Sequence, residues 1–358
     1  MAAADFLLPV YNVAATVRAS ITSCQEQTIS DVRIIVVDDG STDGTSEVVA
    51  DMAAIDPRIT FIKKPNSGIV DALNLGLSYC SSPIVARLDG DDIAYPSRLA
   101  EQIRFLDQNP GCVAVSSNAY KIDENGVRTG MQTEFGSIDQ ADPRVAPSRE
   151  PYLLHPFLTC RRTALIEVSG YRHVHHAEDV DLYWRLQHIG ALKNLDVIHG
   201  EYRVHLNSIT NSGIAGARIA SVYAQLAAIS ETRRREGFDD LLFSATDLPV
   251  VKTKSDLHSL VQHVAPQLDE REVSYLKVAT AAKMMELTSY RDFEIEDADA
   301  IFIRNALNDL SSISPANAKG VQWARNWQAK RLLDKRRLGS VIKLVPMLRL
   351  AKLLAMRN

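Results

Sequence analysis

Three carboxylates within four residues are the feature of this sequence best suited to chemistry. Asp89, Asp91 and Asp92 surround Gly90, and glycine permits the tight backbone path of such a loop. Like charges held this close raise one another's pKa unless a cation compensates them. Hard oxygen ligands on a short loop suit Mg²⁺ or Mn²⁺, which typically bind one or two carboxylates plus substrate phosphates. The pattern predicts a divalent metal site, and its alternative is a solvated turn with helix-capping aspartates.

Two further acidic segments lie elsewhere in the chain. Asp38 and Asp39 follow a β-branched run at 32–37 and begin a cluster of turn formers. Glu178 and Asp179 lie just before a segment with helical character. A carboxylate there can cap the helix, or it can act as a general base that takes a proton from a hydroxyl group. Spacing alone favours the cap and leaves the base open.

A histidine beside an arginine is the last chemical feature of this region. His205 follows Arg203 by two residues, and it is either an ordinary polar residue or a group that faces a diphosphate or metal. The phosphate-binding loops GxGxxG and GxxxxGK[ST] are absent from the sequence. Their absence disfavours dinucleotide oxidoreductases and P-loop NTPases, and it favours a site that holds phosphates through a metal.

The elements that must position these side chains alternate along the first part of the chain. Apolar β-branched runs take turns with segments of helical apolar spacing. This rhythm is typical of a doubly wound, Rossmann-like α/β sheet, whose ligands bind at the carboxyl ends of the strands. The expected strands are 6–8, 32–37, 59–63 and 84–88, and the expected helices are 14–27, 45–55, 68–80 and 97–109.

The pattern changes in the second half of the chain. Strand-like runs largely vanish after about residue 214, and long Ala/Leu/Glu/Arg-rich stretches dominate. We therefore expect an α/β domain at 1–212 and a mainly α-helical C-terminal region at 213–358. Before that boundary we expect strands at 113–120 and 197–204, a hairpin with a loop at 121–150, and helices at 163–168 and 180–189.

Composition describes an ordinary globular protein. The 358 residues are 46% hydrophobic and 23% charged, with a formal net charge of -4, so nothing points to nucleic acid as a partner. The four cysteines are widely spaced, which makes disulfides and structural zinc unexpected. Neither a signal peptide nor an apolar run of membrane-spanning length is apparent. We therefore expect a cytoplasmic protein.

The C-terminal end is strongly basic. Residues 325–358 contain ten Lys/Arg and one acidic residue, and 331–356 mix basic with apolar side chains around Pro346, which should break a helix. A basic amphipathic segment can lie on an anionic bilayer. It can equally pack on its own protein with a basic outer face. The sequence leaves both interpretations open.

Residues 6–210 resemble the family-2 glycosyltransferases of GT-A fold. Each motif is weak alone, but eight in this order are specific. The resemblance is carried by Pro9-Val10-Tyr11-Asn12, Ile35-Val36-Val37-Asp38-Asp39-Gly40-Ser41-Thr42-Asp43, Asn66-Ser67-Gly68, Leu88-Asp89-Gly90-Asp91-Asp92, His155-Pro156, Gly170-Tyr171, Ala177-Glu178-Asp179-Val180-Asp181-Leu182 and Tyr202-Arg203-Val204-His205.

The resemblance implies a role for each matched position. Asp89-Gly90-Asp91 looks like the DxD motif, in which Asp91 would bind the metal and Asp89 the ribose or the metal. Asp179 looks like the general base, and His205 would contact the metal or diphosphate. Further implied donor-binding residues are Pro9 and Tyr11 at the nucleobase, Asp39 at the uracil ring, and Asn12, Asn66, Gly68 and Gly90; Asp38, Asp92, Glu178 and Arg203 would support them.

The implied activity is an inverting, metal-dependent transfer of a single sugar from a nucleoside-diphosphate sugar, favoured as a UDP-sugar, to an acceptor hydroxyl. The implied enzyme is a hexosyl- or N-acetylhexosaminyltransferase, with Mn²⁺ or Mg²⁺ as cofactor. Its acceptor would be a glycan or lipid-linked glycan of bacterial-type surface polysaccharide, such as lipopolysaccharide, capsule or exopolysaccharide. The enzyme could then be peripheral on the inner face of the cell membrane.

Departures from the family and competing functions qualify this expectation. Asp71 and Leu73 stand where many relatives place a basic residue near the phosphates, and the QxxRW motif of processive synthases is absent. A nucleotidyltransferase would normally carry a Gly-rich basic loop after the first strand, but 9–15 contains neither Gly nor Lys/Arg. The other alternative is a non-catalytic nucleotide-sugar-binding protein of the same fold.

Overall fold

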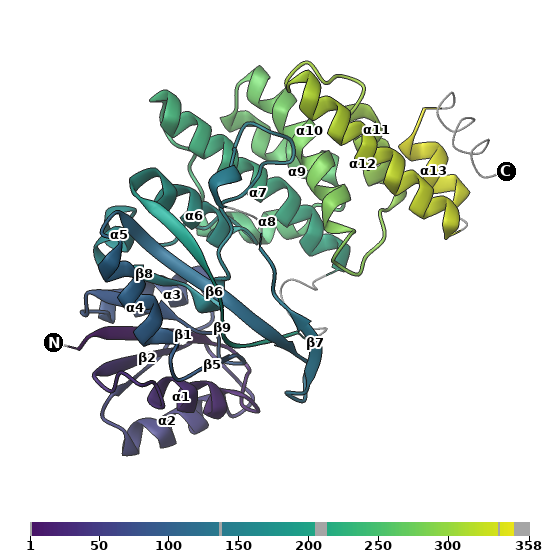
Figure 1. Cartoon of the computed structure of the whole chain (residues 1–358). Helices are drawn as coiled ribbons and strands as arrows, with labels where there is room; N and C mark the ends of the chain where they lie inside the picture. Colours follow the sequence, from purple (N-terminus) through teal and green to yellow (C-terminus); the bar gives the residue numbers. More distant parts are fainter. Residues whose placement is uncertain (1, 136–137, 205–212, 336, 347–358) are drawn as a thin grey trace. The chain divides into compact units, whose positions relative to one another are not determined.

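The computed structural model describes residues 2–135, 138–204, 213–335 and 337–346 and divides into two compact units (Figure 1). The N-terminal unit comprises Met1–Gln140, Pro151–Arg172 and Glu178–His205. The helical unit comprises Ala141–Glu150, His173–Ala177 and Leu206–Asn358. Two short segments that precede the main helices therefore belong to the helical unit. The domain boundary expected at residue 212 lies outside the described residues.

A nine-stranded mixed sheet forms the N-terminal unit, in the order β3-β2-β1-β4-β8-β6-β9-β5 with β7 beside β6. Strands β3, β2, β1 and β4 are parallel, whereas β8 is antiparallel to its neighbours β4 and β6. The alternation in the first part of the chain, which predicted a doubly wound sheet, is confirmed by these four parallel strands, and the later strands add the mixed part of the sheet. The bounds are β1 Ala4–Val10, β2 Val32–Asp38, β3 Ile59–Lys63, β4 Ile84–Arg87, β5 Ile93–Ala94, β6 Cys112–Ile122, β7 Arg128–Gln132, β8 Thr159–Arg161 and β9 Ala191–Arg203.

The central strands are buried on both faces. Alternate side chains of β1 and β2 enter two separate cores, because successive side chains of a strand point to opposite faces. Phe6, Leu8, Ile34 and Val36 belong to one core, and Leu7, Ile35 and Val37 to the other. Each fully buried side chain of this kind contributes about 1.5–3 kcal/mol. The continuous apolar runs in the sequence follow from this two-sided burial.

Helices supply the outer layers of both cores. The first core takes apolar side chains from α1 Val17–Gln25, α2 Thr45–Ile55 and α4 Arg98–Gln108. The second takes them from α3 Ile69–Tyr79, α5 Arg162–Glu167 and α6 Glu178–Ile189. Helix α6 begins two residues earlier than expected, so Asp179 lies in its first turn.

The helical unit confirms that the C-terminal region is mainly α-helical. Buried ion pairs accompany its apolar core: Arg218 pairs with Asp299, and Lys283 pairs with Glu150. The four cysteines, all in the N-terminal unit, are free and buried. The helices are α7 Gly213–Glu236, α8 Leu248–Lys252, α9 Leu257–Val264, α10 Glu270–Leu287, α11 Asp297–Ala306, α12 Pro315–Asp334 and α13 Leu338–Leu344.

The described part of the basic C-terminal end packs on the helical unit. Lys335 pairs with Glu294, Lys343 pairs with Asp297, and Val341 and Leu344 of α13 are buried. These contacts favour the packing interpretation for residues up to 346, and residues 347–358 lie outside the described residues. No helix within the described ranges is long and apolar enough to cross a membrane.

Candidate active site

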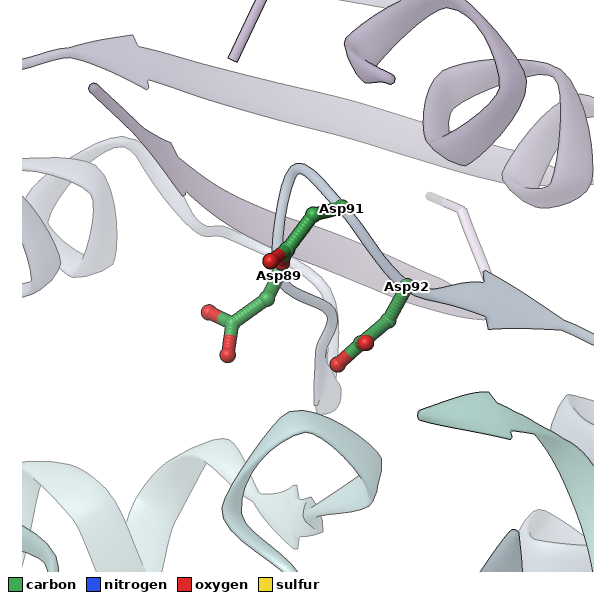
Figure 2. Close-up of side chains that lie close together, drawn as sticks. All are labelled: Asp89, Asp91 and Asp92. Atoms are coloured by element: carbon green, nitrogen blue, oxygen red, sulfur yellow. The ribbon is translucent and has the colours of Figure 1, made fainter. Parts of the chain in front are cut away.

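The acidic loop lies directly after β4, at the carboxyl end of a parallel strand. Asp89, Asp91 and Asp92 each offer one carboxylate oxygen, and these oxygens lie within 4.8 Å of one another (Figure 2). Gly90 is required at the bend, because a Cβ atom there would lie 2.8 Å from a methyl carbon of Val10. The loop is therefore pressed against the end of β1, and its three carboxylates gather on one side.

The electrostatics of this loop favour a bound cation. Arg87, at the end of β4, donates to both carboxylate oxygens of Asp89 at 2.5 and 3.2 Å. Burial, followed by repulsion from Asp91 and Asp89, raises the pKa of Asp92 well above its usual value. The Oδ2 atom of Asp92 is buried without a hydrogen-bond partner among the described residues. A divalent ion bound to this loop would relieve the repulsion among the three carboxylates, so the residues fit a metal.

Arg203 ties the acidic loop to the end of β9. Its main-chain N–H donates to Asp92 Oδ1 at 2.7 Å, and its Nε donates to the carbonyl oxygen of Asp91 at 2.9 Å. Its Nη1 also donates to the carbonyl oxygens of Asp123 and Glu124. One residue therefore holds the carboxylate and the backbone of the loop together, and the supporting role of Arg203 in donor binding stays a prediction.

The second acidic loop, after β2, is organised by its own carboxylates. Asp38 accepts the N–H of Ser41 and the hydroxyl of Ser46. Asp39 accepts the N–H groups of Ser67 and Gly68 at 3.0 and 2.8 Å and also pairs with Lys64. Asp39 thus fixes the 64–68 segment that carries Asn66 and Gly68, so its described partners are protein groups. Contact with a uracil ring stays a prediction.

The remaining predicted donor-binding residues lie around the same two loops. Asn12 is bonded to the loop after β2, because its N–H donates to Ser41 Oγ and its Oδ1 accepts the N–H of Thr42, both at 2.9 Å. Tyr11 is 50% exposed, whereas Pro9 is buried within β1. The structure brings all of these segments to the carboxyl ends of β1, β2 and β4. His205, predicted at the metal or diphosphate, lies outside the described residues.

The acidic start of α6 belongs electrostatically to the same site. Burial and the adjacent Asp179 raise the pKa of Glu178 to about 7, and Asp89 and Arg87 also act on this carboxyl. Asp179 Oδ1 accepts the N–H of the following residue, Val180, at 2.8 Å. This contact resembles local capping within the first turn. The role of Asp179 as a general base stays a prediction.

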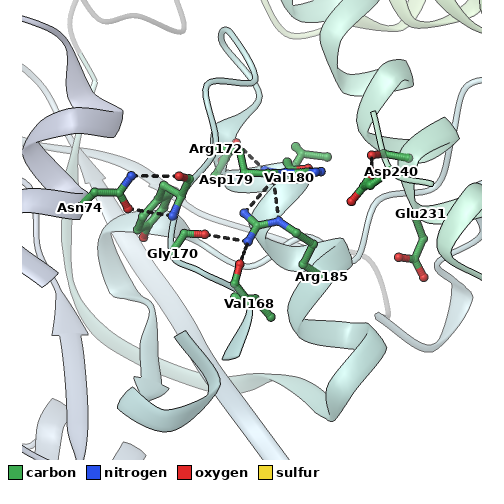
Figure 3. Close-up of polar contacts among 12 residues, drawn as sticks. Asn74, Val168, Gly170, Arg172, Asp179, Val180, Arg185, Glu231 and Asp240 are labelled. Carbon is green, nitrogen blue, oxygen red and sulfur yellow. Dashed lines mark hydrogen bonds and ion pairs between the residues drawn. The ribbon is translucent and has the colours of Figure 1, made fainter. Parts of the chain in front are cut away.

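A polar network fixes the segment that leads to α6 (Figure 3). Asp181 is fully buried and accepts hydrogen bonds from both Arg172 and Arg185. Arg185 also donates to the carbonyl oxygens of Val168 and Gly170 at 2.5 and 2.7 Å. Asn74 of α3 exchanges two 2.9 Å hydrogen bonds with the backbone of Tyr171. The network orients the first turn of α6, where Glu178 and Asp179 lie.

Three groups of the site were not predicted from the sequence. Arg87 pairs with Asp89, and Lys64 pairs with Asp39, so each acidic loop carries its own cation. His155 Nε2 lies 2.9 Å from the hydroxyl of Tyr171, and burial with the nearby Arg87 holds the His155 pKa well below its usual value. The motifs His155-Pro156 and Gly170-Tyr171 are part of the family resemblance, but the sequence did not predict the contact between His155 and Tyr171.

The similarity of this chain to a known protein family lies in the part that forms the sheet. Residues 5–169 match the model of the family described as Glycosyl transferase family 2. The chain is 33% identical over 184 residues to the "Putative glycosyltransferase EpsE" of Bacillus subtilis, covering 50% of this chain and 64% of that protein. It is 28% identical to the "Amylovoran biosynthesis glycosyltransferase AmsE" of Erwinia amylovora, covering 48% and 63%. The chain thus spans less than two thirds of these relatives.

Solved structures resemble most of the chain. The S. aureus TarS fragment 1-349 in complex with UDP-GlcNAc aligns with a TM-score of 0.54 at 14% identity, covering 91% of this chain and 92% of that one. The mannosyltransferase PcManGT from Pyrobaculum calidifontis, in complex with GDP-Man and Mn²⁺, aligns with a TM-score of 0.51 at 15% identity, covering 96% and 85%. These likenesses confirm the expected fold, a GT-A domain followed by a helical C-terminal region.

Proposed function

We propose, from the match of residues 5–169 to the Glycosyl transferase family 2 model, that the protein is an inverting, metal-dependent glycosyltransferase. It would move a single sugar from a nucleoside-diphosphate sugar to an acceptor hydroxyl. The observation that carries this proposal is the cluster of Asp89, Asp91 and Asp92 oxygens within 4.8 Å at the end of β4. Together with the acidic start of α6, the cluster would supply the two parts that a displacement needs, a metal site for the leaving diphosphate and a base for the acceptor hydroxyl.

The donor half of the site would hold a diphosphate. Asp91, with Asp89, is the proposed ligand set for Mn²⁺ or Mg²⁺, and Asp92 and Arg203 support the loop. When bound, the ion would neutralise the charge that develops on the leaving diphosphate. Asn12, Asp39 and the 64–68 segment would surround the nucleoside, with the exposed Tyr11 ring available to the base. Asp89 also pairs with Arg87.

The acceptor half would use Asp179 as the general base. Its carboxylate would take the proton of the acceptor hydroxyl while that oxygen forms a bond to the anomeric carbon. The bond from this carbon to the phosphate oxygen breaks in the same step, and the nucleoside diphosphate leaves with the electron pair. A single displacement inverts the anomeric configuration and needs no enzyme nucleophile. The position of Asp179 in the first turn of a helix anchored by Asp181 supports this role.

The donor, acceptor and location are proposed from the comparisons. A UDP-sugar is favoured, because the TarS fragment is in complex with UDP-GlcNAc, which makes a hexose or N-acetylhexosamine the expected group. The likeness to an amylovoran biosynthesis enzyme favours a surface polysaccharide, with a glycan or lipid-linked glycan acceptor. Attachment to the inner face of the cell membrane would fall to residues 347–358, which contain Arg349, Lys352 and Arg357.

A non-catalytic nucleotide-sugar-binding protein of the same fold is the second candidate. It would share the donor half of the site but would not need Asp179. The two candidates therefore differ in turnover and not in donor binding. The presence of Asp179 together with the three carboxylates of the acidic loop supports the enzyme.

The decisive test measures release of nucleoside diphosphate from UDP-, dTDP- and GDP-sugars, each with Mn²⁺, Mg²⁺ or EDTA. We expect slow release from one donor that needs metal and is lost in Asp91→Asn, since about 10²–10³-fold is typical when a transition-state charge partner is removed. Asp179→Asn should slow transfer while donor binding persists. The exposed Asp51→Asn on α2 is the matched control and should behave like the wild type.

Each outcome distinguishes the candidates. Donor binding without turnover, even with surface-glycan extracts as acceptors, would favour the binding protein. Turnover that survives both EDTA and Asp91→Asn would overturn metal dependence. Retention of the donor's anomeric configuration in the product would exclude the single displacement.

A further inference from the structure

A pocket of about 350 Å³ lies entirely within the helical unit, away from any residue assigned above. Its walls come from four segments that are distant in sequence: His175 before α6, Tyr223 on α7, the 242–250 segment, and Gln267 after α9. The 242–250 segment contributes Phe243, Ser244 and Asp247 to the lining. Nothing in the proposed donor or metal chemistry uses these residues.

His175 gives the pocket one ring nitrogen without a partner, although the ring also bonds to the backbone of Ser244. The side chain is 8% exposed, and its Nε2 atom is buried with no hydrogen-bond partner among the described residues. Burial lowers the pKa of His175 to about 4, so the ring is neutral at pH 7. A buried polar atom without a partner costs about 1–3 kcal/mol, and a ligand hydroxyl would remove this cost. The neighbouring His176 has a left-handed backbone, with φ of 59°.

Asp247 is held rigidly at the same pocket. Its Oδ2 accepts the Tyr223 hydroxyl at 2.9 Å, and its Oδ1 lies 2.7 Å from His263 Nε2. The carboxylate is 30% exposed, so it keeps acceptor positions that face solvent. The arrangement is a preorganised acceptor and is not a free surface carboxylate.

The chemistry of the lining points to a neutral ligand rich in hydroxyl groups. Asp247 is the only charged side chain among the described lining residues, so a phosphate or another anion would be repelled. Asp247, Ser244, Gln267 and His175 offer hydrogen-bond donors and acceptors at separate points of the wall. The half-buried ring of Phe243 offers an apolar face next to them. A sugar ring has this combination of hydroxyl edges and a C–H face.

We propose that this pocket binds a neutral sugar ring of the acceptor glycan, an inference that rests on the proposed transferase function. The chain itself links the pocket to the reaction. His175 belongs to the His173–Ala177 segment, which continues directly into Glu178 and Asp179 at the start of α6. His175, which would bond to the sugar, is thus four positions before Asp179, the proposed base.

The test uses the full chain and measures saturation-transfer NMR to lactose, maltose and N,N′-diacetylchitobiose without any donor. We expect transfer to at least one disaccharide. Phe243→Ala removes the ring face, so this variant should bind the disaccharide about fivefold more weakly than the wild type. His175→Phe should act similarly, because it keeps an aromatic ring against Tyr223 but removes Nε2. Trp323→Ala, at an exposed aromatic of α12, is the matched control and should not change the signal.

The outcomes separate this proposal from the transferase function. Asp91→Asn should keep saturation transfer, because the acidic loop plays no part in this pocket. Absence of transfer to all three disaccharides, or transfer that persists unchanged in both pocket variants, would overturn the sugar site. If donor turnover is absent from the wild type while sugar binding is intact, the proposed function fails and the pocket stands.

Discussion

The main-chain N–H of Arg203 donates a 2.7 Å hydrogen bond to the carboxylate of Asp92, although the two residues are 111 positions apart. The bond joins the end of β9 to the acidic loop after β4. It is reinforced by the pairing of β9 with β5, in which Ile93 lies opposite Glu201. The loop that carries the proposed metal ligands is therefore held from both sides by strands of one sheet.

Arg203→Lys should weaken the affinity of the enzyme for the metal that supports donor turnover. Lysine keeps the charge and the main-chain bond to Asp92, but it cannot replace the several bonds that the guanidinium makes to backbone carbonyls. We expect the Mn²⁺ concentration for half-maximal nucleoside diphosphate release to rise about 10–100-fold. Arg128→Lys is the control, because Arg128 of β7 also pairs with a residue of β9, Glu201. Equal effects in the two variants would contradict a specific role for Arg203.

Gly90→Ala should damage the acidic loop without unfolding the protein. The added methyl group would meet Val10 at 2.8 Å and Val13 at 3.0 Å, so the loop must shift. Overpacking of this kind costs about 1–3 kcal/mol, and a displaced carboxylate would lower the turnover number at saturating donor. Gly111→Ala is the matched control, because a Cβ atom there meets nothing within 4 Å. Wild-type turnover in Gly90→Ala would show that the close approach is unimportant.

Asp181→Asn should destabilise the N-terminal unit in a pH-dependent way. Burial opposes ionisation of Asp181, but Arg185 and Arg172 outweigh it and hold its pKa below the ordinary value of 3.8. Because the pKa is lower in the folded state, the stabilisation is present above about pH 4–5 and is lost as the pH falls through the folded pKa. We expect a loss of about 3 kcal/mol at pH 7. Denaturant unfolding of both proteins from pH 7 to pH 3 would show whether the difference shrinks on acidification.

The cysteines should resist alkylation while the protein is folded. Burial raises the pKa of the Cys24 and Cys80 thiols to about 12, and it raises that of Cys160 further. At pH 8 only about one thiol in 10⁴ would be ionised at such a site, and access is also blocked. Iodoacetamide should therefore modify none of the four cysteines in the native state and all four in guanidinium chloride, as measured by mass spectrometry. Rapid native labelling would mean that the cores open.

Local sequence patterns were sufficient to predict the elements that carry the site. The buried parallel strands read as apolar β-branched runs, and each ends where polar turn formers begin, so the loops after β2 and β4 were predictable. The strand expected at 59–63 is β3, and the helix expected at 45–55 is α2. Patterns of this kind depend on neighbours along the chain, and burial on both faces makes them strong.

Only the tertiary structure decided the strand order, the partners of the carboxylates and the helical pocket. The sequence contains no signal that β8 lies between β4 and β6, or that β9 pairs with both β6 and β5. The partners of the carboxylates are set by folding. Arg87 pairs with Asp89, Lys64 pairs with Asp39, and the N–H of Arg203 bonds to Asp92. A sequence shows which groups are present, whereas their pKa values and partners depend on distances in space, which arise only when the chain folds.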